Sequence, residues 1–208
     1  MTRKACALVL ASLVLGAPTV FASAAKVGPL RLDIPAGFAA AGPTQGRDEL
    51  SVTAWIAVVP GDTSKTLLQA SVYDYKKLPA MSRKALGDAA EKYLREFLLG
   101  IERRRTDYSM SPVQRMKLAE LPAARAQWQG RVNGNAMMGV MYCVIVANRY
   151  VVSFHTQGMT TEPTESMQAA MQAIQAVQLA ASPEPKPPAE KPADPKATDD
   201  AKPADAVQ

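Results

Sequence analysis

Hydrophobic and polar residues alternate along several segments of the chain, a pattern that predicts β-strands. The stretch 137–147 is apolar on both faces, which is typical of a central strand covered by layers on each side. Asn133 and Gly134 just before it predict a hairpin, since a type I′ turn needs two positive φ angles. The other predicted strands are 30–34, 50–59, 66–75, 113–118, 124–132 and 150–157.

Two further segments have the three- and four-residue spacing of amphipathic helices. The first is expected to begin after Ser82 as its N-cap, to run for about five turns and to end near Gly100. The second is expected to begin at Glu162 and Pro163, because proline is favoured at the first helical position. The order of these elements predicts an α+β domain, an antiparallel β-sheet flanked by two main helices.

The N-terminal segment has the pattern of a secretory signal peptide. Arg3 and Lys4 precede an apolar run of about a dozen residues, which is shorter than the roughly 20 that span a membrane. Small residues at Ala22 and Ala24 fit the positions that a signal peptidase recognises. We therefore expect residues 1–24 to be a signal peptide, cleaved after Ala24 or Ala25, and the mature protein to be periplasmic or secreted. The alternative is an uncleaved membrane anchor.

The C-terminal segment 182–208 is rich in proline, alanine and lysine and has no aromatic residue. Such a composition cannot bury enough apolar surface to offset chain entropy, so this tail is expected to be disordered. It leaves 25–181 as the folded domain. A spacer that crosses the cell wall, a docking strip and an inert solubilising tail are all consistent with this composition.

The charge balance is mildly basic. The chain carries 24 Lys and Arg against 19 Asp and Glu, a net charge of +5, and the folded part has the same net charge because the two ends cancel. This excess is too small to indicate a nucleic-acid surface. The expected partner is an envelope protein or an anionic envelope component, and the sequence does not specify an oligomeric state.

Four stretches of the folded segment carry a family resemblance: residues 32–38, 127–134, Tyr142 and 149–152. They resemble PsbP-like and DcrB-like domains. The resemblance covers most of 28–180 and implies a compact antiparallel sheet sandwiched by helices. Members of these families mostly bind other proteins or assist assembly, which implies an accessory role here. Unlike the lipoprotein members, this chain lacks a lipidation cysteine after its apolar run.

The sequence offers little catalytic chemistry. His155 is the only histidine, and it is expected to be a partly exposed strand residue. Cys143 is the only cysteine after signal cleavage and is expected to be a buried, inert thiol. A nucleophile pair of these two residues would need adjacent strands in register. We find no Gly-x-Ser-x-Gly elbow, no metal-ligand spacing and no phosphate-binding glycine loop, so no enzyme activity, metal or cofactor is expected.

One charge cluster follows the first helix at Arg103, Arg104 and Arg105. It is interpreted as a solvated helix end or as a contact for an anion or acidic partner, aided by Lys76 and Lys77 if the strand before the helix ends nearby.

Trp55 and Trp128 lie on strand faces, where core packing is expected over ligand stacking.

Three functions follow from these patterns. The leading hypothesis is an exported non-catalytic accessory protein that recognises other proteins. The alternatives are a small-ligand carrier or enzyme with a pocket near His155 and Trp128, and a cell-wall-associated spacer.

Overall fold

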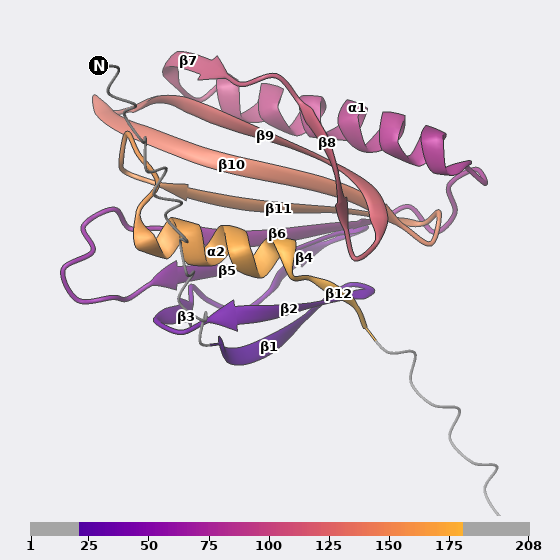
Figure 1. Cartoon of the computed structure of the whole chain (residues 1–208), viewed down its shortest axis with the longest axis horizontal. Coiled ribbons are helices and arrows are strands. Elements are labelled where there is room, and N and C mark those ends of the chain that lie inside the picture. The colour runs from indigo at the N-terminus through magenta and orange to yellow at the C-terminus, as the bar shows by residue number, and fades with distance from the viewer. Residues whose placement is uncertain (1–20, 181–208) are drawn as a thin grey trace, which may run out of the picture.

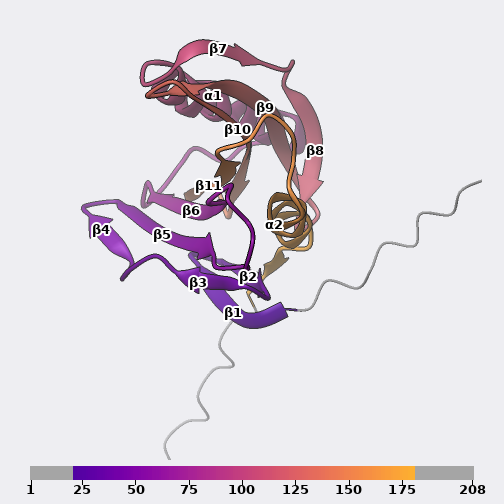
Figure 2. The same ribbon diagram turned by 90° about the vertical axis from the view of Figure 1, so that its left-hand side faces the viewer.

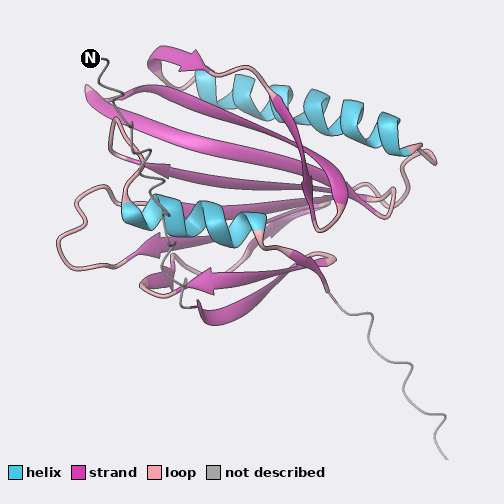
Figure 3. Cartoon of the chain, in the orientation of Figure 1, coloured by secondary structure: helices cyan, strands magenta, loops and turns pink. Residues whose placement is uncertain are grey.

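A computed structural model describes residues 21–180, and these form an α+β fold of two antiparallel sheets and two main helices (Figures 1 and 3). Residues 1–20 of the predicted signal peptide and the predicted tail 182–208 lie outside the described residues. The predicted fold class is thereby confirmed for the domain. The elements are β1 Phe21–Val27, β2 Leu30–Pro35, β3 Phe38–Ala40, β4 Gln45–Arg47, β5 Leu50–Ala57, β6 Leu67–Asp74, α1 Arg83–Glu102, β7 Thr106–Met110, β8 Gln114–Leu118, β9 Leu121–Val132, β10 Asn135–Val146, β11 Tyr150–Gly158, α2 Glu165–Gln175 and β12 Gln178–Leu179.

The large sheet has the order β3-β5-β6-β11-β10-β9-β7, with β4 added at β5 and β8 added at β9. Helix α1 packs on one face and α2 on the other, as the side view shows (Figure 2). Strand β10 has a buried row on each face, which confirms the expected central strand. Leu94 and Leu98 of α1 cover Met141 and Cys143 on one side, and Ile174 of α2 packs into the core on the other.

The small sheet, β1-β2-β12, adds Leu30, Leu32 and Ile34 to the core on the α2 side. Strand β1 includes Phe21 to Ala24, which the sequence assigns to the signal peptide. It pairs along β2, from Phe21 opposite Pro35 to Val27 opposite Leu30. Cleavage after Ala24 or Ala25 stays a prediction, and it would leave only the last residues of this strand.

The turns follow backbone chemistry that the sequence reveals in part. Asn133 and Gly134 have φ of 50° and 79°, as the hairpin prediction requires. The sequence also predicts a tight turn at Asn148 and Arg149, between the strands 137–147 and 150–157, but the positive φ angles fall at Ala147 and Asn148. An alanine in this conformation gives no sequence signal, which is why the turn was misplaced by one residue.

Each helix has one end that lies a few residues from its predicted position. Ser82 caps α1 as predicted, its hydroxyl accepting from the Ala85 amide at 3.3 Å. The helix continues past Gly100 to Glu102. Helix α2 is capped by Thr164, so Pro163 precedes the cap and does not open the helix. A hydroxyl that satisfies the Met167 amide outweighs the preference for proline at the first position.

One close contact between neighbouring strands shapes the face of the sheet that α1 covers. Trp128 on β9 lies opposite Gly139 on β10, and a Cβ at Gly139 would come within 2.6 Å of the indole ring. The missing side chain therefore lets the indole lie flat across β10. Trp128 is 1% exposed, so its expected place in the core is confirmed.

Gly139→Ala should lower the free energy of unfolding by about 1–3 kcal/mol, because the new methyl group displaces a large buried ring. Chemical denaturation measures this change. Gly100→Ala is the control: nothing lies within 4 Å of its Cβ position and it is helical, so it should stabilise by about 0.5–1 kcal/mol. Equal effects of the two substitutions would contradict this packing.

Candidate functional site

Part of the large sheet has no helix over it on the α1 side. Helix α1 packs against β9 and β10 and barely reaches β11, so β5 and β6 extend beyond it (Figure 2). Ile56 at the end of β5 is 40% exposed and Val58 after it is 61% exposed. We call this surface the open face. It consists of Leu50, Val52, Ala54 and Ile56 on β5 and Leu67, Gln69 and Ser71 on β6, whereas Tyr73 near the end of β6 stacks on Phe97 of α1.

Polar side chains form a block where the cover of α1 ends. The register places Ser153 of β11 opposite Ser71, and His155 opposite Gln69. On β10, beneath α1, Cys143 lies opposite Ser153 and Met141 lies opposite His155. A cavity of about 420 Å³ opens over this block, between the sheet and the C-terminal half of α1. We call it the His155 pocket.

His155 forms the floor of this pocket and is 6% exposed, so the expectation of a partly exposed histidine is wrong. Its Nε2 atom accepts a hydrogen bond from the Trp128 indole Nε1 at 3.1 Å. Because an indole nitrogen only donates, the neutral ring must carry its proton on Nδ1. Burial, and then the nearby charge of Arg105, lowers the pKa of His155 to about 3.

This arrangement removes the histidine from base catalysis. Its only basic lone pair is already used by Trp128, so it has no site left to take a proton from Ser71 or Ser153. Cys143 lies opposite Ser153 on the adjacent strand, diagonal to His155, yet no hydrogen bond joins the two side chains within 21–180. Burial also raises the pKa of this thiol far above its ordinary value. No nucleophile pair therefore forms in the described domain.

The three arginines after α1 have different environments. Arg105 lies over the Trp128 ring, with its Cζ atom 4.3 Å from the ring centroid, and donates to the Gln157 side chain at 2.8 Å and to the Ile101 carbonyl at 3.1 Å. Burial lowers the pKa of Arg105. Arg103 and Arg104 are exposed, and Arg104 lines the His155 pocket. Arg103 and Arg104 thus face solvent, whereas Arg105 packs over Trp128 and helps to hold the indole in place.

The structure does not bring Lys76 and Lys77 to this cluster. They follow the end of β6, beside the start of α1, whereas the arginines follow its end (Figure 1). The helix between them has 20 residues, a length of about 30 Å. Lys76 instead lies 4.0 Å from the carboxylate of Glu49. The predicted five-residue patch is therefore two separate surfaces.

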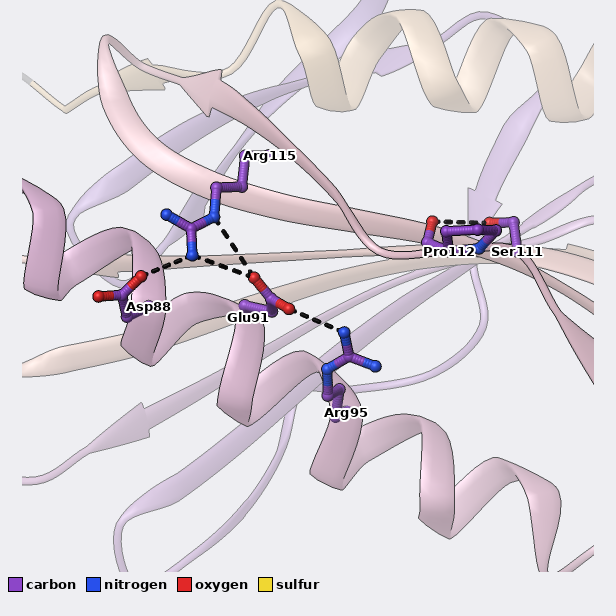
Figure 4. Close-up of polar contacts among 6 residues, drawn as sticks. All are labelled: Asp88, Glu91, Arg95, Ser111, Pro112 and Arg115. Carbon is purple, nitrogen blue, oxygen red and sulfur yellow. Dashed lines mark hydrogen bonds and ion pairs between the residues drawn. The ribbon is translucent and has the colours of Figure 1, made fainter.

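An ion-pair network on the outer face of α1 is another charged cluster (Figure 4). Arg115 of β8 contacts Asp88 at 2.6 Å and Glu91 at 3.3 Å, and Arg95 contacts Glu91 at 2.8 Å. The hydrogen bond from Arg95, and then that from Arg115, lowers the pKa of Glu91. These charges satisfy one another and fasten β8 to the helix, so they leave little for a ligand.

A second cavity, of about 380 Å³, lies between the β5–β6 loop and the start of α2. Its carboxylate, Asp62, accepts hydrogen bonds from the Ser64 backbone and hydroxyl and from Ser166. These bonds, that from Ser166 first, lower the pKa of Asp62. Asp62 is thus paired with these serines, and its bond from Ser166 holds the loop against α2.

Among residues 21–180, no group of three His, Cys, Asp or Glu side chains is placed to hold a metal ion. Within the same range, no helix combines the length and the apolar composition needed to cross a membrane.

The low pKa of His155 predicts a specific pH dependence of stability. The unfolded chain takes up a proton near pH 6.5, whereas the folded chain does so near pH 3. The stability that this histidine contributes is therefore complete above about pH 6.5 and is lost as the pH falls toward 3, by up to about 1.4 kcal/mol per pH unit. His155→Gln, whose amide oxygen replaces the Nε2 acceptor, should show a shallower decline.

Urea unfolding of both proteins from pH 7 to pH 4 measures the difference between the two slopes. Contributions that the two proteins share cancel in this difference. Parallel slopes would mean that His155 is not held neutral in the folded protein.

Comparisons with known proteins bear on the fold. No model of a known protein family matches the sequence, and no curated protein matches it significantly. Three solved structures match with a TM-score of 0.51. LpqN of Mycobacterium tuberculosis, described as involved in cell envelope biogenesis, is 13% identical and the match covers 72% of this chain and 82% of that one. Cyanobacterial PsbP from Synechocystis is 6% identical, with 73% and 87% covered.

The third structure is the Ran-binding protein Mog1p of Saccharomyces cerevisiae, 9% identical, with 78% of this chain and 96% of that one covered. Such low identities establish the architecture alone. The resemblance to PsbP-like domains is confirmed at this level, and the domain has a PsbP-like fold.

Proposed function

We propose that this chain is an exported accessory protein of the cell envelope that binds a partner protein on its open face and catalyses no reaction. One observation carries the proposal: beside α1, the sheet bears an apolar row on β5 that no described helix covers, next to a polar pocket that opens at the edge of α1. Apolar side chains such as Ile56 and Val58, left exposed side by side with polar groups, are typical of an interaction surface.

The chemistry of the pocket supports binding over catalysis. His155 is the only histidine of the chain, and its basic nitrogen is engaged by Trp128. Among the described residues, no carboxylate or imidazole is hydrogen-bonded to the hydroxyl of Ser71 or Ser153, so neither serine is paired with an activating base. Hydrogen-bonding groups without an activating base serve recognition.

Charge favours an acidic partner. Arg103 and Arg104 are exposed at the end of α1, and neither forms an ion pair with a residue in the described part of the chain. Long-range attraction by such charges speeds encounter more than it adds affinity. The apolar row on β5 would then supply most of the buried contact area.

The proposed compartment follows from the signal-peptide pattern of residues 1–24. The shared fold with LpqN, a protein of cell envelope biogenesis, and with the Ran-binding Mog1p is consistent with an envelope location and with protein recognition. Neither likeness identifies the partner.

The His155 pocket also favours a second candidate, a carrier of a small ligand, which was the alternative drawn from the sequence. The two functions differ in their footprint. A small ligand would contact the pocket alone, whereas a partner protein would also contact β5.

Photo-crosslinking in intact cells tests the proposal. A photoreactive residue at Ile56, on the open face, should give a discrete adduct with a protein, and Arg103→Glu with Arg104→Glu should reduce its yield several-fold by reversing the steering charge. The matched control is Gln168, exposed on α2 at the opposite face. Mass spectrometry identifies the adduct. Equal adducts from both positions, or none from Ile56, would contradict the proposal.

A further inference from the structure

We infer that the His155 pocket binds the carboxylate of an aspartate or glutamate side chain of the partner. This inference rests on the proposed function, because it assigns the chemistry by which the open face holds its partner. It is drawn from three buried donors that converge on one cavity, the charges around it and the apolar groups beside it.

The donors are buried yet unused. His155, Ser153 and Ser71 are 6%, 5% and 8% exposed, and all three line the pocket. The proton on Nδ1 of His155 finds no acceptor among the described residues, and neither does the hydroxyl proton of Ser153. These donors line the cavity and their protons have no acceptor in the described part of the protein, so a ligand or ordered water in the cavity is needed to satisfy them.

The donors also lie within reach of one small group. Ser71 and Ser153 are direct neighbours on adjacent strands, a Cα separation of about 5 Å. His155 is two residues beyond Ser153 on the same face, a separation of about 7 Å. The Gln69 amide donates to the Ser71 oxygen at 3.1 Å, which leaves the Ser71 proton to point elsewhere. The two oxygens of one carboxylate can accept from donors at these spacings.

The charges select an anion of low charge. Arg104 lines the rim, and Arg105 beside it has an Nε atom that is buried without a partner. The two cations repel each other, and a bound anion would relieve this. Glu96 also lines the pocket and opposes a second negative charge. A singly charged carboxylate therefore fits better than a phosphate dianion.

The rest of the lining fits the side chain that carries the carboxylate. Tyr73, Phe97, Ile101 and Met141 supply an apolar wall next to the donors. The pocket also continues into the open face at Gln69, where a partner chain would lie. A glutamate or aspartate side chain entering from that face would place its methylenes against this wall and its oxygens on the floor.

The test uses the purified domain and two probes that differ only in the group of interest, N-acetylglutamic acid α-amide and N-acetylglutamine α-amide. Proton–nitrogen NMR follows the His155 ring and the Trp128 indole. The glutamate probe should shift both signals saturably, with at least a tenfold lower Kd than the glutamine probe. Inorganic phosphate should bind more weakly than the glutamate probe.

Two variants locate the site. Ser153→Ala removes a floor donor and Arg104→Gln removes an exposed rim charge, and each should raise the Kd of the glutamate probe several-fold. Ser109→Ala, exposed on β7 outside the pocket, should leave it unchanged. Equal binding of both probes, tighter binding of phosphate, absence of any shift, or insensitivity to both variants would overturn the inference. Crosslinking from Ile56 is independent of these results, so a failed pocket and a failed open face can be told apart.

Discussion

The lack of a side chain at Gly139 is the constraint on which the candidate site depends. Trp128 and His155 belong to strands separated by β10, and the indole can reach the imidazole only because nothing stands between them at Gly139. Once there, the buried indole N–H needs an acceptor, and Nε2 of His155 is that acceptor. Arg105 then closes over the outer face of the ring. A single backbone position thus lets one side chain set the tautomer of a histidine two strands away.

Much of the fold could be predicted from local patterns, because alternation and turn chemistry are properties of neighbouring residues. Strands β5 and β6, the hairpin at Asn133 and Gly134, and the N-cap Ser82 were all predicted in this way. Strand β7 was missed, since it is a mostly exposed edge strand with no regular apolar row. Its pairing with β9 shifts register within five residues, and such irregular edges leave little pattern in the sequence.

The site was predicted less well, because it depends on contacts across strands. Alternation assigns His155 to a face of β11 but does not reveal what covers that face. The available signal was Gly139 within an apolar run, since glycine inside a strand often marks the close approach of another group. The arginines illustrate the same limit. Arg104 and Arg105 are adjacent in sequence, yet one faces solvent and the other locks Trp128.

The polarity of the large sheet changes where the cover of α1 ends. Along one row, Ala126 and Met141 are apolar beneath the helix, His155 and Gln69 are polar beyond it, and Ala54 on β5 is apolar again. A sheet face exposed only to solvent would have polar side chains up to its last strand. A sheet face covered by another helix of this chain would lack polar side chains such as His155 and Gln69. The return to apolar side chains on β5, ending at the exposed Ile56, fits a surface covered part of the time by another molecule. In the proposed complex, the polar block would fix the position of the partner, because a partner that left these donors unpaired would bind less well.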